Sequence, residues 1–299
     1  MGDLLDVDFL SKIINSVKPD IIFHLAAQPI TSLAYQNPLR TFEINIIGTA
    51  SVLEALRRLD NNCSLVSITS DKSYLNKEWV WGYRETDELG GKDPYSASKA
   101  GAEMVLRSYY NTYFTQNGSK RVAVARAGNI IGGGDWAHNR IIPDCIRAWK
   151  NCQAVVIRSP KSVRPWQHVI EPIYGYLLLG LNLYKNNQIN GEAFNFGPNA
   201  VEFKDVGTLI NKFSNLMADK GVNTHVQIKE SNEFSEAGIL KLNSEKALSL
   251  LRWKPILTID EALEYTASWY FEGYWNNADA LVLTQKQIAD FEQKLIQTK

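Results

Sequence analysis

Apolar runs alternate with longer amphipathic segments along the first half of the chain. The apolar runs cover residues 20–26, 64–69 and 122–127. Segments with helical spacing lie between successive runs, at residues 41–59 and 96–113. Runs such as IIFHLAA and RVAVARA are apolar throughout, as expected for strands that helices cover on both faces. This order predicts an α/β fold with an open, doubly wound Rossmann-type parallel sheet.

The second half of the chain has a mixed pattern. Strand-like segments occur at residues 154–158 and 193–197, and helical spacing occurs at 171–184, 205–218 and 260–274. No internal repeat, low-complexity tract or long linker separates the two halves. We therefore expect a smaller mixed α/β lobe that packs closely against the sheet and shares a crevice with it.

Composition narrows the class of protein. The chain has 299 residues, and because 45% of them are apolar, a disordered protein is excluded. Its 32 basic residues balance 32 acidic ones. The chain therefore has no net positive charge to attract the phosphate backbone of a nucleic acid, so we expect no nucleic-acid partner. The longest apolar stretches, such as residues 174–183, fall well short of the roughly 20 residues that span a bilayer, and no signal peptide is recognisable. We expect a soluble cytoplasmic protein without a membrane partner.

Cysteine and histidine usage supports neither a disulfide framework nor a metal site. Cys63, Cys145 and Cys152 form no CxxC pair, and the four histidines show no ligand spacing. The cysteines are interpreted as buried or incidental thiols.

Four strands end in polar or glycine-rich turns. These turns read AAQP, TSDK, GNIIGGGDW and NFGP. Ligands of open parallel sheets bind beyond the carboxyl ends of the strands, so the four turns are expected to outline one site.

The most distinctive chemistry lies in YSASK and TSDK. Tyr95 and Lys99 are four residues apart at the start of a helical pattern, where a cation favours the phenolate and so a proton acceptor. Asp71 and Lys72, beside Ser70, place an acid and an amine together at a strand end. The alternatives are an exposed pair on a helix for the first motif and an Asx-type turn with a solvated lysine for the second.

Two arginines and an aromatic loop are further candidates. Arg158 and Arg164 offer guanidinium forks for a diphosphate, although an isolated arginine is often a surface residue. Trp79 and Trp81 lie near Tyr83 in the loop between TSDK and YSASK, and they predict either a lid or a small aromatic core.

A glycine-rich phosphate loop is expected in a sheet of this kind and is not found in the sequence. The only glycine before the first strand is Gly2, and the run 132–134 comes too late. The chain is therefore expected to begin part-way through a domain.

Together these segments resemble the extended short-chain dehydrogenase/reductases, and among them the CDP-glucose 4,6-dehydratases. The resemblance extends over nearly the whole chain but excludes the amino-terminal glycine-rich segment of that family. The matching segments are HLAAQP at 24–29, TSDK at 69–72, NKEWVWGYRE at 76–85, DPYSASK at 93–99, RAGNIIGGGDW at 126–136, RPWQH at 164–168 and NFGP at 195–198.

The resemblance implies a hydro-lyase that converts CDP-D-glucose to CDP-4-dehydro-6-deoxy-D-glucose, as in the synthesis of deoxysugars for lipopolysaccharide O-antigen. Tyr95, assisted by Lys99 and Ser70, would take the C4 hydroxyl proton while bound NAD takes hydride from C4. Lys72 would remove the C5 proton and Asp71 would protonate the departing C6 hydroxyl. NAD would return its hydride to C6 and act as a prosthetic group.

Binding residues and assembly follow from the same resemblance. It implies an NAD-binding domain of residues 1–128 and 165–200, a nucleotide-sugar lobe of residues 129–164 and 201–299, and a homodimer formed through segments 41–59 and 96–113. Besides Tyr95 and Lys99, the residues implied for NAD are Asp3, Leu4, Leu25, Ala26, Ala27, Gln28 and Asn45. Those implied for the nucleotide sugar are Asn129, Arg158, Arg164 and Asn195.

Two other functions stay open at this point. One is a sugar-nucleotide 4-epimerase or reductase of the same superfamily, against which the Asp71–Lys72 pair argues because epimerisation needs no C5 base or C6 acid. The other is a catalytically silent protein that only binds nucleotide sugar. The glycine-loop gap also leads us to expect weak NAD retention and reduced stability.

Overall fold

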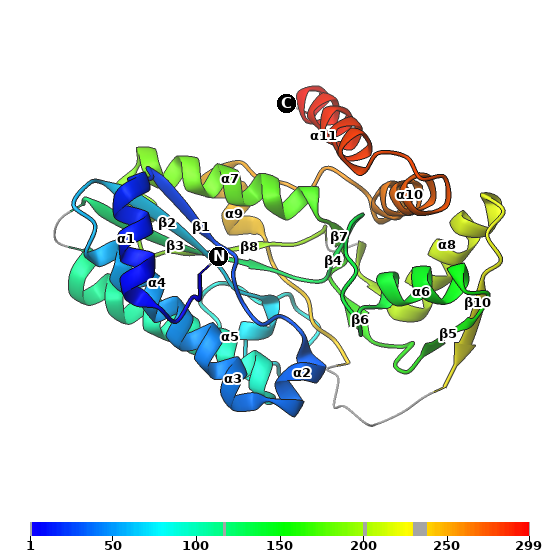
Figure 1. The fold of residues 1–299 in the computed structure, drawn as a ribbon, viewed down its shortest axis with the longest axis horizontal. Coiled ribbons are helices and arrows are strands. Elements are labelled where there is room, and N and C mark those ends of the chain that lie inside the picture. Colours follow the sequence, from blue (N-terminus) through cyan, green and yellow to red (C-terminus); the bar gives the residue numbers. More distant parts are fainter. Residues whose placement is uncertain (1, 116–117, 200–201, 230–237, 299) are drawn as a thin grey trace.

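Four parallel strands form the central sheet. The computed structural model describes residues 2–115, 118–199, 202–229 and 238–298 (Figure 1). The strands lie in the order β1-β2-β3-β8, with Phe23 opposite Val66 and Val66 opposite Ala123. Their bounds are β1 Ile21–His24, β2 Cys63–Ile68, β3 Lys120–Ala127 and β8 Ala193–Phe196. The predicted α/β fold with a parallel sheet is confirmed.

Helices cover both faces of this sheet. On one face α4 (Gly48–Arg57) and α5 (Pro94–Tyr109) pack on the sheet, with α1 (Val7–Val17) against α4; α7 (Ile170–Lys185) and α9 (Glu245–Leu251) cover the other (Figure 1). Along β3, Val122 and Val124 enter the first core while Ala123 and Ala125 enter the second. This explains why the run RVAVARA is apolar throughout.

The predicted helices 41–59 and 96–113 are each interrupted by a π-helical turn. The first consists of α3 (Pro38–Phe42), the π turn η1 (Glu43–Ile47) and α4, and the second of α5 followed by the π turn η3 (Tyr110–Phe114). A short helix, α2 (Thr31–Gln36), precedes them. The Asp93 carboxylate caps α5 by accepting from the Ser96 N–H at 3.0 Å, and Pro94 follows it in the first turn.

A second part of the chain has its own apolar core beside the sheet. Helices α6 (Ile141–Lys150), α8 (Val206–Asp219) and α10 (Ile259–Tyr270) enclose residues that include Trp149, Phe213 and Leu263. Strands β5 (Ala154–Ile157) and β10 (His225–Ile228) pair in parallel at its edge. The π turn η6 (Phe271–Trp275) and helix α11 (Ala280–Gln297) follow α10.

Short elements connect the two parts. β4 (Ile130–Ile131) pairs with β7 (Gln167–His168), and β6 (Val163–Arg164) pairs with β9 (Lys204–Asp205). Single 3-10 turns occur at η2 (Asp71–Ser73) and η4 (Asn187–Ile189).

One expected boundary is wrong in part. The sequence assigned residues 201–299 to the second lobe, yet α9 packs against β8 and α7, and Trp253 lies in the same core as Phe196. Residues 245–253 therefore belong to the layer that covers the sheet, because their apolar side chains complete its second face.

The described residues were also expected to contain no membrane span, no metal site and no disulfide framework. None of these helices has the length and apolar character needed to cross a membrane. No group of three or more histidine, cysteine, aspartate or glutamate side chains there is placed to hold a metal ion. All three cysteines are free thiols, with Cys63 and Cys145 buried and Cys152 exposed.

Candidate active site

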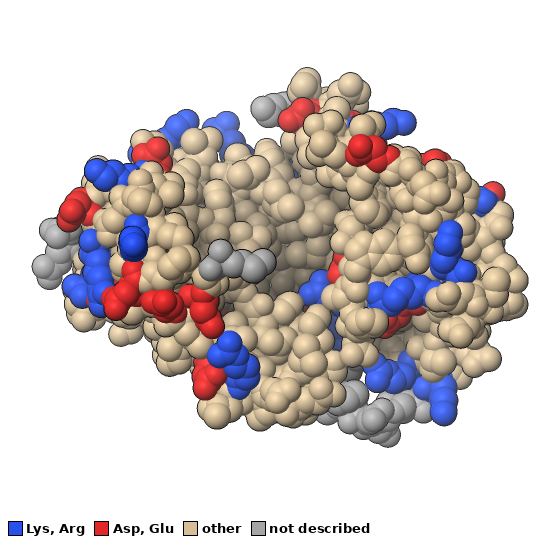
Figure 2. Space-filling model, in the orientation of Figure 1, with Lys and Arg blue, Asp and Glu red and all other residues tan. Residues whose placement is uncertain are grey.

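A cleft of about 750 Å³ lies between the carboxyl ends of the strands and the second part of the chain. The hollow is visible near the middle of the molecule in Figure 2. It brings together ten residues that the sequence singled out, from six separate segments: Leu25, Ala27, Ser70, Asp71, Lys72, Tyr95, Lys99, Asn129, Arg158 and Arg164. The predicted convergence of turns at one edge of the sheet is confirmed for the turns after β1, β2 and β3.

The turn after β2 presents a buried carboxyl group. Ser70 caps η2 by accepting from the Lys72 N–H at 3.2 Å, and its hydroxyl donates to Asp71 Oδ1 at 3.0 Å. Asp71 is only 3% exposed, and its Oδ2 has no hydrogen-bond partner among the described residues. Burial raises the pKa of Asp71, while Lys72, Ser70 and Arg164 oppose the rise. The carboxyl group is thus suited to hold a proton and deliver it into the cleft.

Tyr95 and Lys99 lie one turn apart on α5 and are both buried. Burial raises the pKa of Tyr95 to about 12, and the hydrogen bond between Tyr95 and Ser70 counteracts this. Burial lowers the pKa of Lys99 to about 8, and the charge of Glu103 counteracts that. The Lys99 ammonium donates to the Ile68 carbonyl at 3.5 Å.

The cation that acts on the Tyr95 phenol in this structure is Arg140. Its charge lowers the pKa of Tyr95, whereas the charge of Asp71 raises it. Arg140 itself is held by Asp135 at 3.1 Å, in the loop that precedes α6. The sequence had assigned this effect to Lys99 because helical spacing alone reveals no partner from a distant segment.

Lys72 follows Ser70 in the turn after β2. Its Nζ contacts the Thr31 hydroxyl at 3.4 Å and lies 5.8 Å from the centre of the Tyr95 ring. The Lys72 side chain therefore points toward α2 and Tyr95 and is not the freely solvated side chain of the alternative interpretation. An amine and a carboxyl group reach the cleft from consecutive residues.

A buried ion pair supports this turn from behind. Glu103 accepts from the Thr69 hydroxyl at 2.6 Å and pairs with Arg126 at 2.5 Å. Arg126 in turn donates to the Tyr74 hydroxyl at 2.6 Å. Thr69 and Tyr74 flank the segment 70–73, so one ion pair fixes both ends of the turn that carries Ser70, Asp71 and Lys72.

Asn195 does not contact the cleft, contrary to the sequence prediction. It is fully buried, accepts from the Tyr74 hydroxyl at 2.8 Å and donates to the carbonyls of Tyr83 and Asn243. Because its amide is used inside the protein, Asn195 extends the supporting network and is not available to a sugar.

The turn after β1 is held by Asn45. The Asn45 side chain accepts from the Gln28 N–H at 2.8 Å, donates to the Gln28 carbonyl and donates to the Ser98 hydroxyl at 2.8 Å. The predicted ribose contact by Asn45 is therefore not supported: the residue is buried and links the turn to α5. Leu25 and Ala26 are exposed at the end of the strand.

Asp3 and Leu4 lie outside the cleft lining. Asp3 is exposed and accepts from the Leu5 N–H at 3.0 Å, with Arg40 at 3.7 Å. Leu4 packs against Gly48 at the start of α4, where a Cβ would come within 2.4 Å of the leucine. Leu4 is thus partly a core residue, which its place in a short polar segment did not indicate.

Arginines line the far wall of the cleft. Arg158 is exposed at the end of β5, and Arg164 is buried at β6 and close enough to Asp71 to lower its pKa. Together with Arg140, they place three guanidinium groups around one cleft. Such groups suit phosphate oxygens.

The glycine run 132–134 serves packing as well as the cleft. Gly132 lines the cleft, but a Cβ on Gly133 would lie 2.0 Å from the Trp269 ring, and Gly134 has a φ of +84°. In the aromatic loop, Tyr74 stacks on Tyr83 at 4.9 Å and Trp79 packs beside them in a small core, whereas Trp81 is 67% exposed.

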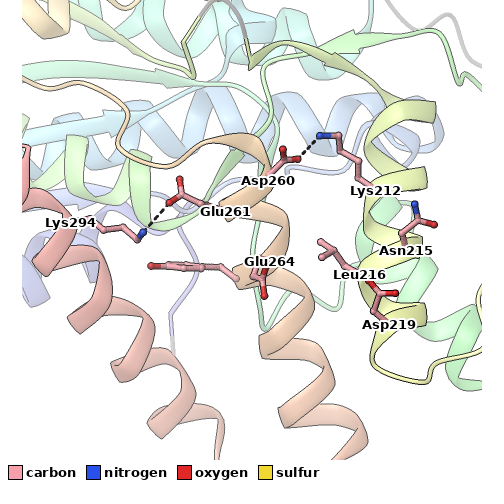
Figure 3. A pocket seen from close by; sticks show the side chains of 9 residues that line it. Lys212, Asn215, Leu216, Asp219, Asp260, Glu261, Glu264 and Lys294 are labelled. Carbon is pink, nitrogen blue, oxygen red and sulfur yellow. Dashed lines mark hydrogen bonds and ion pairs between the residues drawn. The ribbon is translucent and has the colours of Figure 1, made fainter.

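A second hollow of about 500 Å³ lies between α8, α10 and α11 (Figure 3). Both of its lysines are paired with carboxylates, Lys212 with Asp260 at 2.5 Å and Lys294 with Glu261 at 2.9 Å. It gathers no acid–base constellation comparable to that of the cleft.

Sequence reasoning missed several residues of the site. Arg140, Thr31, Tyr35 and Tyr176 line the cleft, and Glu103 and Arg126 support it. Arg140 follows the glycine-rich turn closely and could have been suspected, whereas Tyr176 lies in an apolar helical pattern that predicts only core.

Comparison with known proteins places this geometry in a family. The sequence model of the family described as GDP-mannose 4,6 dehydratase matches residues 1–266. The chain belongs to this family. The CDP-glucose 4,6-dehydratase of Salmonella typhimurium is 40% identical over 97% of this chain and 81% of that protein. The CDP-paratose 2-epimerase of Salmonella typhi is 24% identical over 90% of this chain and 82% of its own length.

Several solved structures share the fold of this chain. A UDP-glucose 4-epimerase from Thermotoga maritima superposes with a TM-score of 0.78 at 21% identity, covering 91% of this chain and 83% of that one. A dTDP-glucose 4,6-dehydratase from Bacillus anthracis, in complex with NAD, gives 0.72 at 23% identity, covering 92% and 79%. At these identities the likeness concerns the Rossmann-type fold alone.

Proposed function

We propose that the chain is an NAD-dependent nucleotide-sugar 4,6-dehydratase and that its substrate is CDP-glucose. The observation that carries the proposal is the meeting, in one cleft, of the Asp71–Lys72 pair with Tyr95 and Lys99. The nucleotide and sugar are supported by the 40% identity to the Salmonella typhimurium enzyme.

The residues of the cleft suit the first step at C4. The Tyr95 oxygen takes the proton of the C4 hydroxyl, with Ser70 bonded to the phenol and Arg140 favouring its charged form. NAD, when bound, supplies the hydride chemistry: it accepts hydride from C4 and returns it to C6.

The next steps use the neighbouring pair. Once C4 is a ketone, the C5 proton is acidic and Lys72 removes it. Asp71 donates its proton to the C6 hydroxyl, the C6–O bond breaks and water leaves. Lys72 returns its proton to C5, so the products are the 4-keto-6-deoxy sugar nucleotide and one water.

Proton balance assigns a further task to Ser70. Each turnover leaves the C4 hydroxyl proton on Tyr95 and removes one proton from Asp71. The Ser70 hydroxyl bonds to both groups, to Asp71 Oδ1 at 3.0 Å and to the Tyr95 phenol. It can therefore pass the proton from Tyr95 to Asp71 and restore the starting state without bulk solvent.

The edge of the cleft at β1 fits part of NAD. Among the described residues, the Lys99 ammonium makes one hydrogen bond, at 3.5 Å, so two of its three N–H donors are left for ligand hydroxyls. Leu25, Ala26 and Ala27 offer an apolar turn beside it, held by Asn45 through Gln28. These residues would hold the nicotinamide and its ribose.

The arginines suit the other end of the substrate. Arg158, Arg164 and Arg140 would bind the diphosphate, and Asn129 lines the same wall. This arrangement orients the hexose toward Tyr95 and Asp71.

An epimerase or reductase is the second candidate from the same superfamily. It would need Tyr95 and Lys99 but no acid and base at C6 and C5. The buried, partner-free Asp71 Oδ2 beside Lys72 favours dehydration. A protein that only binds nucleotide sugar would gain nothing from that pair.

Mass spectrometry of the reaction tests the proposal. The purified chain is incubated with CDP-glucose, with and without a large excess of NAD, and the substrate is followed for loss of one water. We expect loss of water that depends on added NAD. CDP-glucose binding without loss of water at any NAD concentration would overturn it and favour the binding protein.

We also propose that the chain acts as a cytoplasmic homodimer. Leu39, Ile47 and Met104 are 71%, 55% and 56% exposed on α3, η1 and α5, which lie side by side. A second copy related by a two-fold axis would cover this apolar face with the same face of its own.

A further inference from the structure

Tyr176 places an unused hydroxyl in the wall of the cleft. It lies on α7, is 5% exposed, and its ring meets the Phe196 ring edge to face with centroids 5.7 Å apart. Its hydroxyl has no hydrogen-bond partner among the described residues. Buried hydroxyls are nearly always paired, so an unpaired one at a ligand cleft points to a ligand atom as its partner.

A second unpaired group lies close to it. The Oδ2 atom of Asp71 is also buried, and no described residue hydrogen-bonds to it. Tyr176 lies near enough to Asp71 and Tyr95 for both to affect its ionisation, and all three residues line the cleft. The two unpaired groups, one on α7 and one on the turn after β2, therefore face a common space.

We propose that the Tyr176 hydroxyl is a substrate-positioning group that donates a hydrogen bond to the C6 hydroxyl oxygen, beside the Asp71 carboxyl group. This inference rests on the proposed function. It assigns to α7, one of the helices that cover the sheet, a direct contact with the reacting end of the sugar.

The arrangement of the other groups selects O6 as the partner. Tyr95 and Ser70 attend to O4, and Lys72 is assigned to the C5 proton. O6 is bonded to the carbon next to C5 and has two lone pairs, so it can accept from Asp71 and from Tyr176 together. As the C6–O bond breaks, Asp71 transfers its proton to this oxygen, and Tyr176 stabilises the developing charge without giving up its own proton.

Burial supports the donor role of Tyr176. The burial of the phenol, with the nearby charges of Asp71 and Tyr95, raises its pKa above the ordinary value. This shift favours the protonated phenol, which is the form that donates a hydrogen bond. A group that must donate throughout the cycle requires this property.

Calorimetry with two sugars tests the proposal without relying on turnover. Wild type, Tyr176→Phe and Tyr174→Phe are titrated with CDP-glucose and with CDP-6-deoxyglucose, which lacks O6. Tyr174 is the matched control because it lies on the same helix but packs against Phe291, outside the cleft. We expect wild type and the control to prefer CDP-glucose about tenfold, and Y176F to prefer it less than threefold.

Stability and turnover complete the test. Y176F keeps the ring and loses only an unpaired hydroxyl, so its melting temperature should equal or exceed that of wild type. Its kcat should fall at least tenfold with KM changed less. If Y176F and wild type prefer CDP-glucose over CDP-6-deoxyglucose by the same factor, the role of Tyr176 is overturned and the proposed function still stands. Failure of wild type to bind CDP-glucose would overturn the proposed function, and this inference with it.

Discussion

At the scale of single residues, the site works by placing polar groups where burial changes their proton affinity. Asp71 and Tyr95 are both buried, so each holds its proton more tightly than in water, and the Ser70 hydroxyl that they share opposes this effect. Lys99 is buried beside Glu103 and holds its proton less tightly. Acid and base functions are thereby separated within a few residues of chain.

Asp71→Asn should remove the acid that protonates the C6 hydroxyl. We expect turnover to fall by about 10²- to 10⁴-fold, the usual worth of a positioned acid, while CDP-glucose still binds. In wild type, activity should decline as pH rises through the raised pKa of Asp71, because only the protonated carboxyl group can donate. Product assays across pH, with calorimetric binding as the control, check both statements; a variant of wild-type rate would contradict them.

Glu103→Gln should lower the pKa of Lys99 below about 8, because the carboxylate that stabilises the ammonium is gone. The other charged or titratable groups nearby are His24 on β1, Tyr95 on α5 and Arg126 on β3. NMR titration of ε-¹³C-labelled lysines, with Lys99→Arg to assign the signal, measures this pKa without NAD or substrate.

The double variant Glu103→Gln/Arg126→Met separates charge from structure. It removes both buried charges, so stability should recover relative to E103Q, whose unpaired Arg126 costs about 3–5 kcal/mol. The pKa of Lys99 should stay low in the double variant. Its return to the wild-type value would show that Glu103 acts through structure alone.

Local spacing accounts for the residues that the sequence located correctly. Tyr95 and Lys99 share α5 because four residues make about one helical turn, and Ser70 to Lys72 follow a buried strand. Asn45 and Asn195 were both implied as ligand-binding residues by the resemblance. Their side chains instead bond to Gln28, Ser98, Tyr74, Tyr83 and Asn243, which lie up to 121 residues away along the chain, so these bonds cannot be predicted from neighbours in sequence.

At the scale of elements, Glu171 joins the sheet layer to the second part of the chain. It lies in the first turn of α7, and its Oε1 accepts the N–H groups of Ile256 at 2.8 Å and Leu257 at 2.5 Å. Its Oε2 is buried without a partner among the described residues. Burial raises the pKa of Glu171 from 4.5 to about 7, and the two N–H bonds oppose the rise.

This raised pKa should make the fold less stable as pH rises. Between 4.5 and about 7 the folded protein holds a proton that the unfolded chain releases, so the free energy of unfolding falls across that interval by up to about 3 kcal/mol. Glu171→Gln keeps the acceptor oxygen and should flatten the dependence. Urea unfolding at several pH values measures the free energy of unfolding of wild type and of Glu171→Gln. An equal pH dependence in the two proteins would count against the role of Glu171.

Element prediction succeeded where the apolar pattern was strong and failed where tertiary contacts supply stability. Strands β1, β2, β3, β5 and β8 and helices α5, α7, α8 and α10 were expected within a few residues of their observed bounds, whereas the short strands β4, β6, β7 and β9 and strand β10 were not expected. Helices α1, α6 and α11 were not expected. α11 buries only Phe291, so its sequence carries little apolar periodicity. The π turns η1 and η3 were also missed, because one extra residue per turn leaves no clear sequence signal.

At the scale of the whole molecule, the proposed function depends on the cleft where the carboxyl ends of the sheet strands meet the second part of the chain. The sheet contributes the turns after β1, β2 and β3, and the second part contributes Arg140 and Arg158. Arg140 acts on Tyr95 across this boundary. The cleft is thus a property of the assembled molecule rather than of either part.

Met104→Glu should weaken the proposed dimer. Met104 is 56% exposed on α5, and a charge there would be buried against the second copy. Light scattering should show a shift from dimer to monomer at micromolar concentration. Ile296→Glu is the matched control, since Ile296 is 72% exposed on α11, remote in sequence from the proposed face. A monomeric wild type, or an unaffected M104E, would contradict the proposal.

The sequence by itself predicted the parallel sheet and helices α4, α5 and α7 that cover it, and it proposed Ser70, Asp71, Lys72, Tyr95 and Lys99 as the catalytic residues. These follow from apolar runs and short spacings, which are local and survive in any context. Only the tertiary structure decided which polar groups remain available. Asn45 and Asn195 are consumed by internal bonds, while Asp71 Oδ2 and the Tyr176 hydroxyl are left unpaired in the cleft. The physical reason is that pairing of a buried polar group depends on segments distant in sequence, which only folding brings together.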